Sequence, residues 1–415
     1  MRASRISFLA AAVAVALVGC GSDDDDNAGP STGQLIEPPT VVATVPRATL
    51  GAGARCDVRV VSINYNTPGA RAGEVSNSSG GVLVPTGADP ACQGPFPLLA
   101  YTRGTAVVKG TSMSDPANTE LQGLMATFAS AGYMVVATDY LGYAKSQYPF
   151  HPYLHSDSEA SSAIDSIRAA RAWAATNSVP LSGRVMLYGY SQGGHSSLST
   201  QRAIETRAAG EFNLAAAGHG ASPAALSTAL RTGQEILGGQ FFIPFLITAW
   251  QKVYGDVYAN PAEIFTPQFA PTIENLLPAA DPNALGVLPP GPAYNAALFQ
   301  PAFITGLQTG NTTSNGVLRA ALRNDLVASD WNPTAPTRFC AGSQDPTVIY
   351  ATSTQLAINR WGTLPNVSAR DVNPEVQALA QQRGLTPTQT VVQYHGGLAP
   401  VVCLQDMRAF FDARR

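Results

Sequence analysis

The sequence predicts an α/β protein: a mostly parallel sheet flanked by helices, with an inserted, mainly helical cap. Strand-like apolar runs alternate with segments of helical spacing, the pattern of parallel strands joined by helices. The alternation stops between Pro223 and Trp331, a stretch too long for a simple connection between neighbouring strands. We therefore expect a second module inserted late in the sheet.

The elements can be placed in order along the chain from their apolar patterns. Strands are expected at 56–67, 81–85, 96–101, 133–140, 184–190, 214–221, 337–342 and 388–394. Helices are expected at 120–131, 158–176, 350–361 and 404–411, with a further helix directly after residue 191. This order predicts a core made of 47–222 and 332–415 and a cap, or lid, made of 223–331. The aromatic residues of the cap between Phe241 and Tyr258 are expected in part to line an apolar groove.

The N-terminus has the pattern of an export signal. Arg2 and Arg5 precede an apolar stretch of signal-peptide length that is too short to span a bilayer. The stretch ends in Leu-Val-Gly-Cys, which is typical of a bacterial lipobox, so we expect removal of 1–19 and lipidation of Cys20. Residues 20–46, with the run Asp23–Asp26, are expected to form a solvated tether rather than a calcium site. The alternative is a soluble secreted protein with an incidental cysteine.

Composition excludes several classes of protein. Of 415 residues, 45% are hydrophobic and 13% charged, which excludes a coiled coil and a charge-rich disordered chain. A net charge of −3 offers no basic surface for a phosphate backbone, so nucleic-acid binding is excluded. In an oxidising compartment the four cysteines after Cys20 should form two disulfides. Three pairings are possible, and chain proximity favours Cys56–Cys92 and Cys340–Cys403.

A G-x-S-x-G motif follows the apolar strand 184–190 and precedes a helix. The pentapeptide alone is a weak signal, but this setting places Ser191 on a sharp turn at the end of a strand. We expect glycines on either side because the backbone angles of such a turn are unfavourable. The amide of Gln192 would then lie at a helix N-terminus, where it can bind a developing oxyanion.

A serine nucleophile needs a base and an orienting carboxylate. His395 is expected to follow the last strand on a flexible Gly-Gly loop. Of the other four histidines, His195 is expected to pack against the sheet, His219 to be a core or cap-facing residue, and His151 and His155 to be loop or capping residues. Asp345 follows the preceding strand, and Asp330 and Asp371 do not stand at carboxyl ends of expected strands. The chain order Ser191, Asp345, His395 is that of an α/β-hydrolase.

The loop after the strand 96–101 should supply a second oxyanion donor. Gly104 lets the backbone turn inward, which makes the Thr105 amide the best candidate, although an ordinary glycine turn is the alternative. Neither a zinc motif nor a phosphate-binding glycine loop occurs in the sequence, so no metal, nucleotide or other cofactor is expected.

Several motifs together resemble the secretory lipase family of α/β-hydrolases, the fungal lipase-A type and its bacterial relatives. They are GYSQGG, GYMVVATDYLGY, and HPYL followed by DSEASSAIDSIRAAR, and the resemblance covers the chain from about Cys56 onward. It implies a hydrolase of acyl esters with a cap over the acyl pocket and no cofactor. By position it implies Ser191 as nucleophile, Asp345 as acid and His395 as base.

One departure from the family concerns the oxyanion loop. Such proteins often carry His-Gly-Thr there, whereas this chain has Arg103-Gly104-Thr105. An exposed guanidinium at the pocket mouth would favour acidic or polar esters.

The sequence predicts a serine esterase or lipase that takes a small-molecule or lipid ester, acts as a monomer and touches a bacterial membrane only through its lipid. A peptidase on the same fold is an alternative, but no acidic pair is present to hold a peptide amine. An inactive surface lipoprotein is a further alternative, although all three triad positions are filled.

Overall fold

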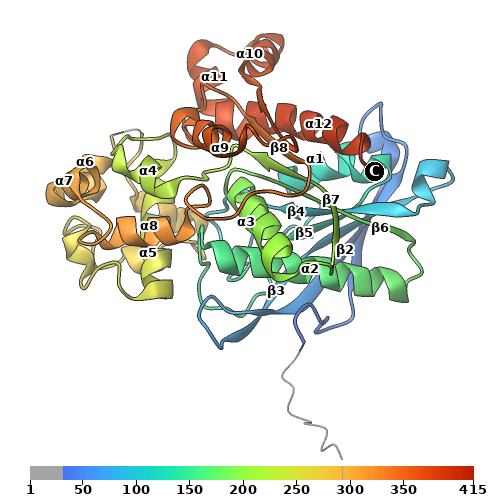
Figure 1. The fold of residues 1–415 in the computed structure, drawn as a ribbon, viewed down its shortest axis with the longest axis horizontal. Helices are drawn as coiled ribbons and strands as arrows, with labels where there is room; N and C mark the ends of the chain where they lie inside the picture. Colours follow the sequence, from blue (N-terminus) through green and yellow to red (C-terminus); the bar gives the residue numbers. More distant parts are fainter. Residues whose placement is uncertain (1–30, 292) are drawn as a thin grey trace, which may run out of the picture. The chain divides into compact units, whose positions relative to one another are not determined.

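The computed structural model describes residues 31–291 and 293–415 (Figure 1). A nine-stranded sheet runs in the order β1-β2-β3-β5-β4-β6-β7-β8-β9. The first four strands of this order pair antiparallel, and the pairs from β5 to β9 are parallel. The sheet consists of β1 (Thr40–Val45), β2 (Asp57–Pro68), β3 (Val75–Thr86), β4 (Phe96–Thr102), β5 (Met134–Thr138), β6 (Leu181–Tyr190), β7 (Asn213–Gly220), β8 (Thr337–Ala341) and β9 (Val367–Asp371). The predicted α/β class is confirmed.

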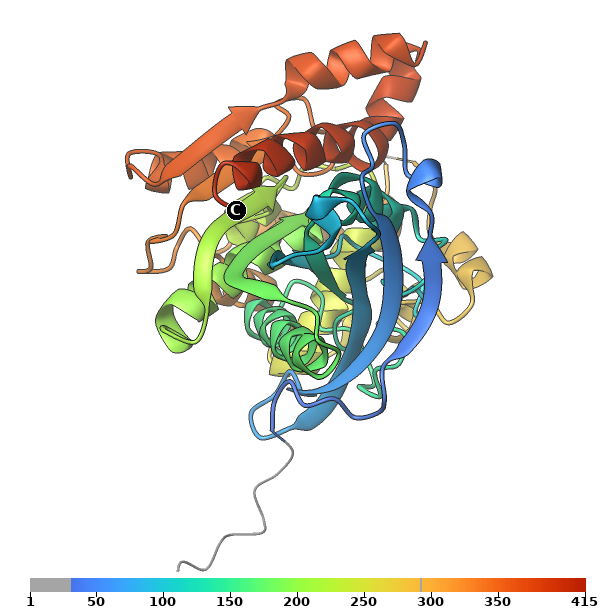
Figure 2. The same cartoon turned by 90° about the vertical axis from the view of Figure 1, so that its right-hand side faces the viewer.

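Helices cover both faces of the sheet (Figures 1 and 2). On one face, α2 (Ser156–Thr176) and α3 (Gln192–Arg207) share an apolar cluster with the strands. On the other face, α1 (Thr119–Thr127) and α12 (Ala399–Asp412) form a second cluster. Every residue of β4 and of β5 is buried, as continuous apolar runs predict for strands covered on both sides.

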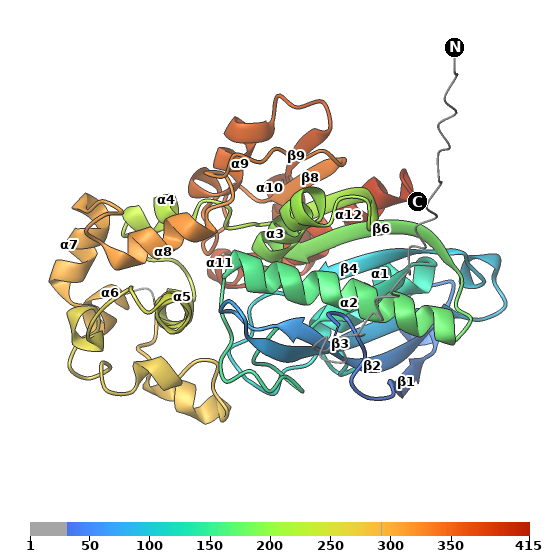
Figure 3. The same cartoon turned by 60° about the horizontal axis from the view of Figure 1, so that its bottom comes forward.

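The insertion between β7 and β8 is helical and lies beside the sheet (Figure 3). Its side chains form a separate apolar cluster, to which Tyr153 and Leu154 of the core contribute. Within the range expected for the cap, the helices are α4 (Leu226–Arg231), α5 (Gly239–Tyr254), α6 (Asn295–Leu298), α7 (Pro301–Thr309) and α8 (Gly316–Asn324).

The expected last strand, 388–394, is wrong. Most of it forms the helix α11 (Pro387–Gln393), and the last strand of the sheet is β9. The helix begins there because Thr386 and Gln389 form a capping box, with a proline at the first helical position. The β-branched run that suggested a strand, Val391–Val392, is exposed on the surface of this helix. The remaining helices after β8 are α9 (Thr354–Trp361) and α10 (Asn373–Gln382).

The expectation that residues 20–46 form a solvated tether is wrong for the end of this range. Residues 40–45 form β1, which pairs with β2, and Leu35 forms an isolated bridge with Tyr65. The β-branched sequence TVVATV favours a strand, and β2 offers it an edge. The expected signal peptide, Cys20 and Asp23–Asp26 lie outside the described residues.

Two disulfides join Cys56 to Cys92 and Cys340 to Cys403, with S–S distances of 2.04 and 1.99 Å. This is the pairing that chain proximity favoured. The second bridge connects β8 to α12. In the described part of the chain, the structure has no helix both long and apolar enough to cross a bilayer.

Candidate active site

Ser191 lies on the sharp turn between β6 and α3. Its backbone is in a left-handed region that side chains rarely adopt, with φ of 61°. Contrary to expectation, neither flanking glycine has a positive φ, and it is the close approach of neighbouring backbone that demands both. A Cβ on Gly189 would lie 2.1 Å from the Gly193 carbonyl oxygen, and one on Gly193 would lie 2.0 Å from the Thr102 oxygen.

Three side chains distant in sequence meet at this turn. The Nε2 atom of His395 lies 2.8 Å from the Ser191 hydroxyl, and its Nδ1 lies 2.7 Å from a carboxylate oxygen of Asp345. The other Asp345 oxygen accepts hydrogen bonds from the amides of Thr347 (2.9 Å) and Val348 (3.1 Å), which hold the buried carboxylate in place. The arrangement can transfer a proton from serine to imidazole while the carboxylate orients the ring.

His395 does not stand where the sequence suggested. It lies in a π-helical turn, Tyr394–Leu398, between α11 and α12, rather than on a loop after a strand. Asp371, by contrast, does end a strand, β9, contrary to expectation. Its carboxylate accepts from the amides of Ser343 and Asn373, and Asp345 contacts His395 instead.

The other four histidines are buried, and their rings contact neither the Ser191 hydroxyl nor the Asp345 carboxylate. His219 contacts Ser197 and Gln201, and burial lowers its pKa to about 3. Burial likewise lowers the pKa of His151 to about 4. His155 caps α2, as expected, whereas His195 contacts Glu159 on α2 and the Asn324 carbonyl oxygen rather than the sheet.

The two expected oxyanion donors lie near Ser191. Gln192 begins α3 and Thr105 follows β4, and no described residue accepts a hydrogen bond from either backbone N–H. The Thr105 hydroxyl lies 2.8 Å from that of Tyr153. The Gly104 amide donates to the Glu120 carboxylate at 2.8 Å, which holds the loop in position.

A buried carboxylate behind the turn was missed by sequence analysis. Glu159 accepts hydrogen bonds from the Gln192 side chain (2.7 Å), the Leu154 amide (3.0 Å), His195 (3.2 Å) and the Ser196 hydroxyl (2.5 Å). Burial alone would raise its pKa, but the hydrogen bonds and charge of His195 prevail and lower it. The sequence signals were an acidic pair at the start of an expected helix and the position of Glu159 in the motif DSEASSAIDSIRAAR, which carries the family resemblance.

The expected role of Arg103 is wrong. Its side chain is buried, donates to the Thr111 carbonyl oxygen and lies over the ring of Tyr143, 5.0 Å from the centroid. The guanidinium therefore does not reach the pocket mouth. The charged side chain that does line the pocket of Ser191 and His395 is Glu120.

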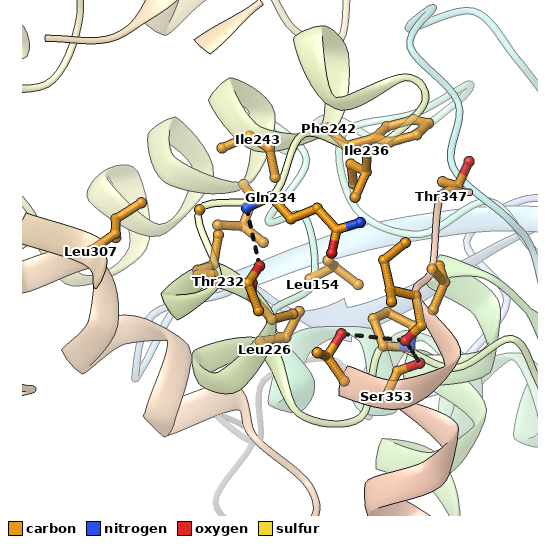
Figure 4. Close-up of a pocket in the computed structure, with 18 of the residues that line it drawn as sticks. Leu154, Leu226, Thr232, Gln234, Ile236, Phe242, Ile243, Leu307, Thr347 and Ser353 are labelled. Carbon is orange, nitrogen blue, oxygen red and sulfur yellow. Dashed lines mark hydrogen bonds between the residues drawn. The ribbon is translucent and has the colours of Figure 1, made fainter. Parts of the chain in front are cut away.

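Ser191 lines two pockets. The first is an apolar cavity that is lined by residues of the core and of the insertion (Figure 4). Its lining includes Leu154, Leu226, Ile236, Phe242, Ile243 and Leu307. The second is lined by His395, Thr105 and Glu120, among others, and shares Phe242 with the first. Of the aromatic residues expected to line a groove, Phe242 does so, whereas Phe245 and Trp250 are buried in the insertion's own cluster.

The sheet, the strained serine turn and the histidine between serine and aspartate define an α/β-hydrolase. The model of the secretory lipase family matches residues 117–279. The rice cell wall degrading esterase LipA from Xanthomonas oryzae is 31% identical, with a TM-score of 0.82 and coverage of 93% of this chain and 100% of that one. The chain therefore belongs to the secretory lipase family and is a carboxylic ester hydrolase.

Two more distant structures share the fold. A putative hydrolase from Legionella pneumophila is 22% identical, with a TM-score of 0.74 and coverage of 92% and 98% of the two chains. Candida antarctica lipase A in its closed state is 15% identical, with a TM-score of 0.60 and coverage of 92% and 90%. No curated protein sequence matches the chain. The family and the two disulfides indicate an exported protein.

Proposed function

We propose that Ser191, His395 and Asp345 form the catalytic triad of this ester hydrolase. His395 takes the hydroxyl proton as Ser191 attacks the ester carbonyl carbon. The bond to the alcohol then breaks, His395 returns the proton to the leaving oxygen, and the acyl group stays on Ser191. Water then attacks the acyl carbon and gives a proton to His395. The bond between the acyl group and Ser191 breaks, His395 returns the proton to the Ser191 oxygen, and the acid is released. The observation that carries this proposal is the pair of contacts made by His395, at 2.8 and 2.7 Å.

The backbone amides of Gln192 and Thr105 are proposed to bind the oxyanion. Support comes from their position beside Ser191 and from the lack of another acceptor within the described residues. Pre-aligned donors of this kind stabilise the charge that develops on the carbonyl oxygen.

The apolar cavity is proposed to take the acyl group, with the insertion acting as its cap. Its lining of leucine, isoleucine and phenylalanine side chains suits an apolar chain. We further propose that the protein acts as a monomer and is anchored to a bacterial membrane through a lipid on Cys20, as the lipobox-like sequence favours.

A chain-length series of p-nitrophenyl esters tests the proposal. Ser191→Ala should lower kcat by at least about 10⁴-fold on every ester, because it removes the nucleophile. Ser199→Ala is a matched control: this buried hydroxyl on the same helix has no hydrogen-bond partner among the described residues, so turnover should stay as in the wild type. Normal turnover by Ser191→Ala would refute the assignment. The best chain length in the wild type would separate an esterase from a lipase.

A further inference from the structure

The alcohol part of the substrate can be assigned to one of the two pockets. This step rests on the proposed function, in which His395 returns a proton to the leaving alcohol oxygen. His395 lines the second pocket together with Gly396, Val401 and Leu404, and it does not line the apolar cavity. The alcohol must therefore occupy the second pocket, while the acyl chain enters the first.

The second pocket contains an unbalanced negative charge. Among the described residues, Glu120, in the first turn of α1, is the only carboxylate that lines it, and no lysine or arginine does. One carboxylate oxygen of Glu120 accepts from the Tyr101 hydroxyl (2.6 Å) and the Gly104 amide (2.8 Å). In the described part of the chain, the second oxygen has neither a hydrogen bond nor an ion pair, and the side chain is partly exposed.

Two tyrosines line the same pocket, but their hydroxyls are not exposed in it. Tyr188 and Tyr190 line it, and the hydroxyls of both are buried without a hydrogen-bond partner among the described residues. Buried polar atoms without partners are uncommon, because each costs free energy unless a ligand or water satisfies it. Because a ligand in the pocket does not reach these two hydroxyls, Glu120 is the group that is available to bind its polar part.

We propose that Glu120 recognises the alcohol part of the substrate and selects alcohols that carry a hydrogen-bond donor, either a hydroxyl or a protonated amine. Its free oxygen accepts the donor, and its charge attracts cations and repels carboxylates. This preference is opposite in sign to the one that an exposed Arg103 would have produced.

Paired esters with the same acyl group and equal alcohol shape test this preference. The 2-(dimethylamino)ethyl ester, protonated near neutral pH, is compared with the 3-methylbutyl ester, and the 2-hydroxyethyl ester with the propyl ester. A unit charge about 6 Å from the carboxylate, at an effective dielectric of about 40, changes kcat/KM about tenfold. The wild type should therefore favour the cationic ester by about tenfold, and should also favour the hydroxyl ester.

Glu120→Gln should abolish the preference for the cation. It should keep part of the preference for the hydroxyl, because the amide oxygen still accepts a hydrogen bond. Glu375→Gln, in the first turn of α10 and outside this pocket, is the control and should leave both ratios unchanged. Equal rates within each pair in the wild type, or unchanged ratios in Glu120→Gln, would overturn the proposal.

Two further measurements separate failure of the Glu120 proposal from misfolding of the variant and from failure of the proposed triad. In the wild type, raising the salt concentration to about 1 M should weaken the preference for the cation but not for the hydroxyl, since salt screens only the charge. This measurement does not depend on whether Glu120→Gln folds. Failure of the proposed triad would leave Ser191→Ala active on all four esters, whereas failure of the Glu120 proposal leaves the triad intact.

Discussion

Replacing Glu159 with alanine should damage both stability and catalysis. The carboxylate is fully buried behind the serine turn and accepts hydrogen bonds from Gln192, Leu154, His195 and Ser196. Alanine leaves these donors without their acceptor in a site that water does not reach. The side chain of Gln192 also loses one of its two contacts and keeps only the one to His151 at 2.7 Å, so the backbone amide proposed to bind the oxyanion is held less firmly.

The loss of stability and the loss of kcat can both be estimated from these contacts. Breaking a buried charged network costs about 3–5 kcal/mol. Unfolding entropy is about 2.1 cal/mol/K per residue, or about 0.8 kcal/mol/K for the compact unit Thr32–Arg415, so Tm should fall by about 4–6 °C. Loss of one oxyanion donor lowers kcat by about 10²–10³-fold, and displacement of a donor should lower it by about 10–100-fold.

The assay combines thermal unfolding with kcat and KM measured per titrated active site. The matched control is Asp165→Asn, a buried carboxylate on the same helix that pairs with Arg168 at 2.8 Å and contacts no site residue. It should lose stability and keep kcat within about twofold. The reasoning is refuted if Glu159→Ala keeps its kcat, or if the control loses kcat to the same extent.

Two further outcomes are expected. The pKa of His219 is about 3 in the folded protein, and it is about 6.5 in the unfolded chain. Between these two pH values the unfolded state therefore binds more protons than the folded state. As a result, the free energy of unfolding decreases as the pH drops below about 6.5. Acidification from pH 7 to 4 should lower the free energy of unfolding by about 3 kcal/mol through this residue. In denaturant unfolding, His219→Gln should therefore lose less stability than the wild type over this pH range, and an equal loss in both proteins would contradict this. Reduction of Cys340–Cys403 should lower activity more than helix content, because the bridge ties the strand before Asp345 to the helix after His395; equal losses by assay and circular dichroism would argue against it.

Local pattern was enough to locate the serine turn and the aspartate that contacts His395. An apolar run that leads into G-x-S-x-G predicts a strand, a sharp turn and a helix. Both β6 and the helix after it formed where expected. The reason for expecting His395 as the base is partly mistaken, because a Gly-Gly sequence is typical of a loop after a strand, whereas this residue lies in a π-helical turn. The capping box of α11 defines that region as helix, a signal present in the sequence but outweighed there by the β-branched run.

The sequence by itself determined the fold class and the chain order of serine, aspartate and histidine, because both depend on short-range apolar periodicity and turn chemistry. Only the tertiary structure decided which charge faces the pocket. Arg103 turns inward over Tyr143 and Glu120 turns toward the site, and both choices depend on packing partners that local pattern does not encode. Glu159 became visible for the same reason: a buried carboxylate is stable only through donors from other elements, and their proximity is a property of the folded chain.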